Sequence, residues 1–326
     1  MPPLESAERA GTALALEAPV QRKRMLVIAN PYATTMSERL KSLVVYALQG
    51  RYDVDAVDTE ERGHATQLCR EAAAEGYDVV VAFGGDGTVN EAANGLANTG
   101  TALTALPGGA TNVYCRMLGI PGDVVDATEH LLRLADDWRP RRFDLGSVNG
   151  RHFLFSSGYG LDAAVVRRVD AHPRLKARLR HWYFAYAGLT TFAREYGVRP
   201  PKIDTEVAGR TVRGVTALVQ VGDPYTYFAG HPLHVAEDIA LGDGTIAGAV
   251  LERAAPLDVP TVMARLFARR LRVGAHRRVF AWTGQTAARS LSADGRPVPL
   301  QVDGDYIGDA TEARFAVLPG ALTFVC

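Results

Sequence analysis

The chain is poor in cysteine, carries no net charge and has no long apolar run. Its three cysteines, Cys69, Cys115 and Cys326, are far apart and odd in number, which fits a reducing cytoplasm and matches no zinc-site spacing. Basic and acidic residues balance at 36 each, so nothing indicates nucleic acid as a partner. No apolar run approaches the ~18 residues that a membrane span needs. These absences favour a cytoplasmic protein.

The start of the chain has no folding pattern. The first twenty residues lack a basic start followed by a long apolar core, so we expect no signal peptide. Residues 1–21 are rich in Ala, Glu and Pro without periodicity, and we expect a disordered lead-in. The 326-residue length suffices for two domains, and a hydrophobic content of 47% is typical of a soluble globular protein.

A Gly-rich turn within residues 79–91 joins an apolar strand pattern to a helix pattern. Glycines let the backbone turn tightly and approach a ligand closely. The N–H groups at the start of a helix are unpaired and partly positive, which suits a phosphate. The turn lacks the Gly-Lys-Ser/Thr ending of a Walker A loop. Asn90 stands where a dinucleotide fingerprint has its third glycine, so the turn indicates a phosphate site of another kind.

Asp86, in the middle of this turn, is unexpected because a carboxylate repels phosphate. It is explained if it acts through a cation or takes a proton from a substrate hydroxyl. Thr88 and Glu91 have the spacing of a capping box, so closing the helix start is an open alternative for them. Capping does not need the glycines from Gly84 to Gly87, which therefore favour ligand binding.

Strand and helix patterns alternate between residues 22 and 141. We expect strands near residues 25–29, 52–57, 77–83 and 101–106, with helices near 37–49, 64–74 and 89–97. This alternation predicts an α/β domain with a parallel sheet covered by helices. Ligands of such sheets lie at the carboxyl ends of the strands, which is where Asn30, Thr59, Gly85 and Thr111 fall.

The pattern changes between residues 142 and 326 to alternating runs typical of antiparallel strands. Asn149-Gly150 is a strong type I′ hairpin signal, and Ala208-Gly209 indicates another. We expect strands at residues 212–221, 245–251, 277–282, 298–302 and 314–317. Helices are expected in an insert near 163–196 and at 259–271. The sequence therefore predicts a β-rich, sandwich-like second domain, with a last strand that is free to return to the first.

Several motifs together resemble the diacylglycerol kinase and sphingosine kinase catalytic-domain family, of the bacterial lipid kinase type. The Gly84–Thr88 loop is similar to the family's nucleotide loop, which NAD kinases and phosphofructokinases share more distantly. The motifs of the second half distinguish this family from those two. The other stretches that carry the resemblance are 30–33, 59–65, 106–112, 143–146, 157–162, 243–244 and 302–305.

The resemblance implies ATP and Mg²⁺ as cofactors and a lipid alcohol as the acceptor. Asp86 would help to hold the catalytic Mg²⁺, and Asp305 would take the proton of the acceptor hydroxyl. Asp243 would bind a structural Mg²⁺ with the backbone carbonyls near Ala240 and Thr245. The implied nucleotide-binding residues are Asn30, Pro31, Thr34, Thr59, Gly84, Gly85, Gly87, Thr88, Asn90, Glu91, Gly109, Thr111 and Asn112.

Three departures from the family pattern leave alternatives open. Ala110 replaces a Thr, Val113 replaces an Asp, and Asp305 replaces a Glu that is one methylene longer. A turn-forming role is an alternative for Asp305 and the favoured role for Asp303. The alternative functions are an NAD-kinase-like phosphotransferase for a soluble acceptor, and a nucleotide-binding protein of the same fold without turnover.

The helical insert contains a basic and then aromatic stretch, residues 174–186, that includes Arg174, Lys176, Arg178 and Arg180. It predicts peripheral contact with an anionic membrane. The alternative is a helix that packs its rings on the β domain. His231 and His234 are expected in a solvent-facing loop rather than in a metal site. A homodimer is left open.

Overall fold

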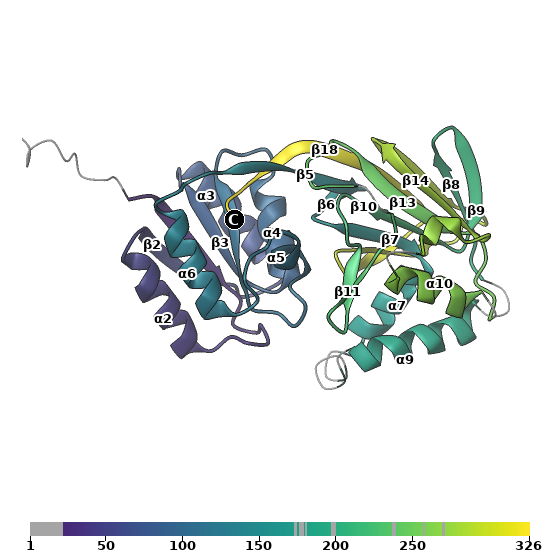
Figure 1. Cartoon of the computed structure of the whole chain (residues 1–326), viewed down its shortest axis with the longest axis horizontal. Coiled ribbons are helices and arrows are strands. Elements are labelled where there is room, and N and C mark those ends of the chain that lie inside the picture. The colour runs from purple at the N-terminus through teal and green to yellow at the C-terminus, as the bar shows by residue number, and fades with distance from the viewer. Residues whose placement is uncertain are drawn as a thin grey trace, which may run out of the picture.

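The computed structural model describes residues 22–172, 175, 179, 181–196, 200–236, 239–256, 258–268 and 271–326. Within these residues the chain forms an α/β domain and a β-rich domain that lie side by side (Figure 1). The predicted fold class is confirmed. The expected lead-in, residues 1–21, lies outside the described part of the chain.

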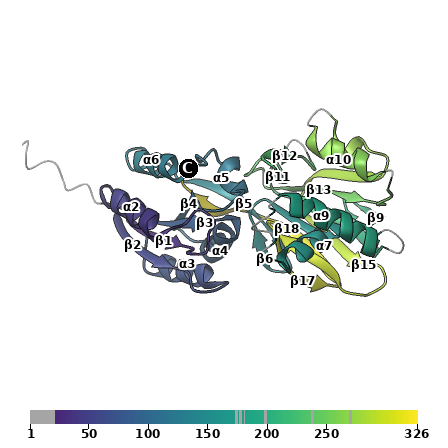
Figure 2. The same cartoon turned by 90° about the horizontal axis from the view of Figure 1, so that it is seen from below.

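The first domain contains a parallel sheet in the order β2-β1-β3-β4. Its strands are β1 (Arg24–Ala29), β2 (Asp53–Asp58), β3 (Val79–Gly84) and β4 (Ala102–Pro107). The inner strands β3 and β4 are buried throughout, which explains their continuous apolar sequence. Figure 2 shows helices on both faces of this sheet. They are α2 (Glu38–Gln49), α3 (His64–Ala74), α4 (Asp86–Leu96), α5 (Val113–Met117) and α6 (Val124–Leu134).

Helix α4 begins three residues earlier than the sequence predicts. Gly85 is its N-cap residue, in an extended conformation, and Asp86 is the first helical residue. The Thr88 amide donates to the Gly85 carbonyl at 3.0 Å, so Thr88 lies within the first turn. The capping-box interpretation of Thr88 and Glu91 is therefore wrong, because the glycine-rich turn itself starts the helix. Asp86 consequently lies at the helix N-terminus, where a negative charge is favoured.

The second domain packs two sheets of mainly antiparallel strands. One sheet has the order β14-β13-β10-β7-β16-β17. Its strands are β7 (Ser156–Gly160), β10 (Thr216–Gln220), β13 (Ile246–Leu251), β14 (Val279–Gln285), β16 (Val298–Val302) and β17 (Asp305–Ala310). Asn149, Gly150, Ala208 and Gly209 have positive φ angles, as the two predicted hairpin turns require. The predicted strand at residues 212–221 is wrong, because the chain there forms the end of one strand and all of another.

Two long strands join the domains, namely β5 (Arg141–Val148) and β18 (Glu312–Phe324). They pair with each other along most of their length, and Phe324 pairs in parallel with Leu103 of β4. A ten-stranded sheet therefore runs from one domain into the other, and the C-terminus lies in the first domain (Figure 1). The remaining members of this sheet are β6 (Arg151–Phe153), β8 (Ile203–Val207), β9 (Arg210–Gly214) and β15 (Ala287–Ser292).

The helices of the second domain lie together below its sheets in the view of Figure 1. They are α7 (Leu161–Asp170), α9 (His181–Thr191) with a π-helical turn (Phe192–Tyr196), and α10 (Val259–Phe267). A small hairpin of β11 (Thr226–Phe228) and β12 (His231–Leu233) lies near α10. Within the described residues, no helix combines the length and apolarity needed to cross a membrane.

Candidate active site

Three loops meet at the carboxyl ends of β1, β3 and β4. The Gly108 amide donates to the Gly84 carbonyl at 2.8 Å, and the Asn30 amide donates to the Phe83 carbonyl at 2.9 Å. Glycine is required where the two glycine-rich loops touch, because a Cβ on Gly109 would lie 2.8 Å from the Gly85 Cα. The loops therefore form one backbone surface, beside the N-terminus of α4, that suits a phosphate chain.

Asp86 is the first residue of α4 and lies beside these loops. Its Oδ1 accepts the Tyr114 amide at 3.2 Å, which ties it to the start of α5. Burial raises the pKa of the Asp86 carboxyl to about 6; the Val113 and Tyr114 amides and Arg116 lower it, and Asp305 raises it. Two carboxylates that repel each other beside a phosphate surface favour a cation between them. The carboxylate oxygens of Asp86 are donors of the kind that Mg²⁺ prefers.

Asp305 reaches this surface from the second domain, at the start of β17. A Cβ on Gly87 would lie 3.0 Å from the Asp305 Oδ2, so the carboxylate lies against the Gly84–Thr88 loop. Residues 219 positions apart in the sequence, Asp86 and Asp305, thus face each other across the domain junction. The sequence predicted both, and the tertiary structure brings them together.

Asn90 has partners that sequence reasoning did not foresee. Its side chain is buried, donates to the Asp303 Oδ2 at 2.7 Å and accepts from Arg151 at 2.8 Å. The Asp303 carboxylate also accepts the amides of Leu154, Phe155 and Ser156 at 2.7–3.0 Å. Asn90 and Asp303 therefore fasten α4 to the turn that carries Asp305. Asp303 has a positive φ of 48° within the turn, as the favoured turn-forming role requires, and its carboxylate in addition links distant segments. Nucleotide binding by Asn90 stays a prediction.

The other predicted nucleotide residues differ in their placement. Asn112 closes its own loop by exchanging two hydrogen bonds of 2.8–2.9 Å with the Gly109 backbone. Asn30 donates to the Thr88 hydroxyl at 3.2 Å, which links β1 to α4. Thr34 is exposed, and the neighbouring Thr35, which was missed, is the residue that donates to the Gly108 carbonyl. The nucleotide roles of the full predicted set, including Pro31, Thr59, Glu91 and Thr111, stay predictions.

The predicted structural metal loop forms a tight turn. The Asp243 carboxylate accepts the Ala240 amide at 2.7 Å, and the Ala240 carbonyl accepts the Asp243 amide at 3.3 Å. Asp144, which was not predicted as a site residue, accepts the amides of Gly244 and Gly320 at 2.6 and 2.8 Å. In the described part of the chain, no group of three or more His, Cys, Asp or Glu side chains is arranged to hold a metal. The metal role of Asp243, Ala240 and Thr245 stays a prediction.

His234 contradicts the expected solvent-facing loop. Its side chain is buried and its Nδ1 lies 2.8 Å from the Asp223 carboxylate, whereas His231 is exposed as expected. Sequence spacing could not reveal the partner, because Asp223 lies on a different strand end. His234 and Asp223 form a buried polar contact.

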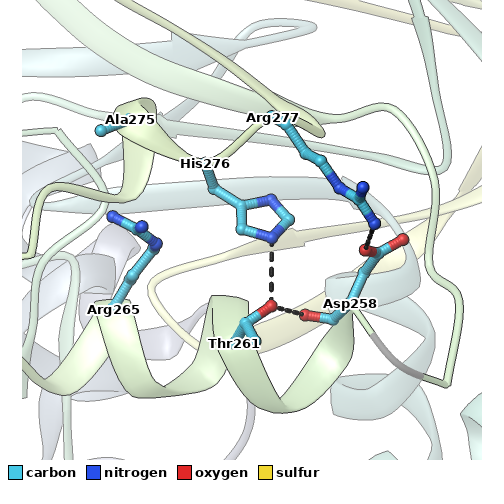
Figure 3. Close-up of a pocket in the computed structure, with 6 residues that line it drawn as sticks. All are labelled: Asp258, Thr261, Arg265, Ala275, His276 and Arg277. Atoms are coloured by element: carbon cyan, nitrogen blue, oxygen red, sulfur yellow. Dashed lines mark hydrogen bonds and ion pairs between the residues drawn. The ribbon is translucent and has the colours of Figure 1, made fainter.

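Two cavities lie away from Asp86 and Asp305. One, of about 290 Å³, lies where the domains meet and is lined by both apolar and charged side chains, including Met117, Leu241 and Asp223. The other, of about 410 Å³, lies between α10 and the turn before β14 (Figure 3). There the Thr261 hydroxyl lies 3.0 Å from the His276 ring and donates to the Asp258 carbonyl, so the wall is held by its own hydrogen bonds. The loops, and not a cavity, define the candidate site.

Comparison with known proteins agrees with this arrangement. Residues 24–148 match the diacylglycerol kinase catalytic domain, and residues 156–326 match the YegS C-terminal NAD kinase beta sandwich-like domain. The diacylglycerol kinase of Bacillus subtilis (strain 168) is 31% identical over 241 residues, which are 71% of this chain and 75% of the relative. A probable lipid kinase YegS-like protein of Pseudomonas savastanoi pv. phaseolicola is 28% identical over 93% of this chain and 92% of its own.

A solved structure of a diacylglycerol kinase from Bacillus anthracis str. Sterne has the same fold. It covers 93% of this chain and 96% of its own, with a TM-score of 0.68 and 20% identity. The two domains and the matches define a kinase-type enzyme. The chain belongs to the diacylglycerol kinase family, as its motifs indicated.

Proposed function

We propose that this protein is an ATP-dependent lipid kinase that transfers the γ-phosphoryl group to the hydroxyl of a lipid such as diacylglycerol. The observation that carries the proposal is the position of Asp305 against Gly87 of the nucleotide loop. This contact brings a carboxylate of the second domain next to the helix N-terminus that suits phosphates. Family membership supports a lipid kinase, and names lipid hydroxyls as the acceptor class to test.

The residues of this chain contribute to the transfer in two ways, by positioning the phosphates and by accepting the proton of the acceptor hydroxyl. The backbone of the three loops and the first turn of α4 hold the phosphates, which fixes the direction of attack. Asp305 accepts the proton of the acceptor hydroxyl while a bond forms from that oxygen to the γ-phosphorus. The bond from the γ-phosphorus to the bridging oxygen breaks, and ADP leaves. Asp86 would hold Mg²⁺, which neutralises phosphate charge when bound.

The direct test is transfer of ³²P from labelled ATP to a panel of lipid alcohols, with NAD as the soluble acceptor. Labelled lipid that depends on Mg²⁺ supports the proposal. Labelled NAD without labelled lipid would favour the NAD-kinase-like alternative. Nucleotide binding without labelled product on any acceptor would favour the binding protein without turnover.

Asp305 provides a sharper test of the same proposal. Asp305→Asn should lower kcat with little change in the KM for ATP, because the nucleotide is held by the first domain. Asp305→Glu restores the longer carboxylate of the family pattern and should keep substantial activity. Full activity of the Asn variant would remove Asp305 from the role of base.

We also propose that the acceptor is met at an anionic membrane surface. Trp182, Tyr186 and Leu189 share one face of α9 at i, i+4 and i+7, with exposed fractions of 71%, 60% and 69%. The opposite side of α9 packs on α7 through Tyr183 and Ala187. Exposed rings beside cations suit a lipid interface. The predicted cations Arg174, Lys176, Arg178 and Arg180 precede α9 in sequence and lie outside the described residues.

Sedimentation with vesicles tests this surface. The parent should bind anionic vesicles more strongly than neutral ones, with an attraction that weakens in salt. Changing the four cations to Gln together, or Trp182 and Leu189 to Ala together, should reduce binding without changing affinity for ATP. If both variants sediment with anionic vesicles as well as the parent does, these helices serve only to pack on the second domain and do not bind the membrane. The cytoplasmic location and the homodimer stay predictions, and light scattering tests the latter.

A further inference from the structure

The turn that carries Asp305 is fixed on both sides of that residue. The Gly304 amide donates to the Gln301 Oε1 at 2.9 Å, and the Tyr306 amide donates to the Asp170 Oδ2 at 3.1 Å. Asp303 is held by the three amides and by Asn90, as described above. The backbone amides on either side of Asp305 are therefore bound by side chains from β16 and α7, and α4 holds the neighbouring Asp303 side chain. Such a turn presents its carboxylate in one place.

Gln301 is the buried link of this arrangement. Its Nε2 donates to the Asp162 Oδ2 at 2.8 Å and to the Tyr225 hydroxyl at 2.9 Å, and the Tyr225 hydroxyl donates to the same Asp162 oxygen at 2.9 Å. An amide whose nitrogen faces a carboxylate must present its oxygen on the other side. Asp162 therefore decides that Oε1, and not Nε2, faces the Gly304 amide.

The motif at residues 157–162 now has a physical explanation. A Cβ on Gly158 would lie 2.1 Å from the Asp162 Oδ2 and 2.9 Å from the Gln301 Nε2, so glycine leaves the room in which these groups meet. Asp162 lies in the first turn of α7, where the helix dipole favours its charge. The same helix supplies Asp170 near its other end. Figure 2 shows α7 beside β17, and α7 also contacts β16.

We propose that Asp162 and Gln301, with Tyr225, are positioning residues that orient the Asp305 turn for proton acceptance. They act through the Gly304 amide and do not touch the substrate. The proposal rests on the proposed function for its kinetic consequence. Its structural part, the control of the turn by the Gln301 amide, is independent of the reaction catalysed.

An exchange of the two side-chain types tests this network. Gln301→Glu places a carboxylate against Asp162, so the two groups repel and the contact at Gly304 is disturbed. Asp162→Asn on its own should be mild, because the amide can turn its oxygen toward Gln301. In the double variant the donor and acceptor are interchanged: Asn at 162 donates to Glu at 301, Tyr225 donates to Glu, and Glu still accepts from Gly304.

We expect Gln301→Glu to lower kcat about 10- to 100-fold, in line with misplacing a catalytic group, with the KM for ATP within about twofold. Adding Asp162→Asn should return kcat to within about threefold of the parent. Asp309→Asn is the matched control, since Asp309 lies on the same hairpin in contact with the Tyr306 hydroxyl. It should leave kcat unchanged. The proposal would be overturned if Gln301→Glu had the kcat of the parent, or if the double variant had a kcat no higher than that of Gln301→Glu.

Hydrogen exchange at residues 303–306 separates this proposal from the proposed function. Gln301→Glu should exchange at least tenfold faster there than the parent, and the double variant should regain protection, whether or not any lipid is phosphorylated. If the parent protein phosphorylates no lipid, the proposed function is refuted. The hydrogen-exchange rates at residues 303–306 would still show whether Gln301 and Asp162 hold the turn. Equal exchange in all variants would refute the positioning role even in an active enzyme.

Discussion

The contact between the two glycine-rich loops predicts that Gly109→Ala impairs nucleotide use without unfolding the protein. The new Cβ would lie 2.8 Å from the Gly85 Cα, whereas ordinary contact begins at 3.4 Å, so the loops must part by about 0.6 Å (3.4 minus 2.8). The obstacle is backbone and cannot rotate away. A misplacement of ~1 Å costs about 10²-fold in rate, so we expect a loss of at least ~10-fold in kcat/KM for ATP.

The assay is steady-state kinetics with ATP varied at saturating acceptor, together with ATP binding by calorimetry and thermal unfolding. Gly100→Ala is the matched control, because it makes the same change where no atom lies within 4 Å and φ is not positive. The control should match the parent. If folded Gly109→Ala keeps kcat/KM for ATP within twofold of the parent, the two loops do not form the phosphate surface.

Three further predictions follow from the same geometry. Asp86→Asn should lower kcat at least ~10²-fold with the fold intact, and near-normal turnover would remove Asp86 from the mechanism. Because the pKa of Asp86 is raised to about 6, the carboxylate should become protonated as pH falls through that value, and kcat/KM for ATP should fall with it. Arg116 lowers this pKa, so Arg116→Gln should move the fall in kcat/KM to higher pH. A kcat/KM that stays constant down to pH 5 would contradict this role of Asp86. Phe324→Ala, which removes a fully buried ring packed on Tyr114 and Phe143, should cost about 3–5 kcal/mol in urea unfolding, and a loss below ~1 kcal/mol would show that the end of β18 does not support the first domain.

Much of the first domain was predictable because its signals are local. The apolar strands, the helical spacing from Glu38 to Gln49 and the glycine-rich turn at Gly84 are each written within a few neighbouring residues. The carboxyl-end rule then gathers the loops at one edge of the sheet without knowledge of the coordinates. For the same reason the two hairpin turns were correct, since positive φ angles at Asn149-Gly150 and Ala208-Gly209 depend on the turn residues themselves.

Local signals failed where a distant partner decided the outcome. The helix that was expected to start at a capping box with Thr88 starts at Gly85 instead. His234 can be buried because the Asp223 carboxylate lies within hydrogen-bond distance of its ring. The strands β15 and β17 were not predicted. β17 carries charged and glycine residues that become strand only by pairing with β16. The ten-stranded sheet was not expected because strand order depends on which segments meet in space.

The sequence by itself determined the fold class, the family resemblance and the two carboxylates, Asp86 and Asp305. The tertiary structure decided how they are used. It brought Asp305 against Gly87 and let Asn90 donate a hydrogen bond to Asp303. It also placed Gln301 between Asp162 and the Gly304 amide of the turn. The physical reason is that dihedral preferences and apolar periodicity are properties of neighbouring residues, whereas hydrogen bonds between buried groups depend on segments that only packing brings together.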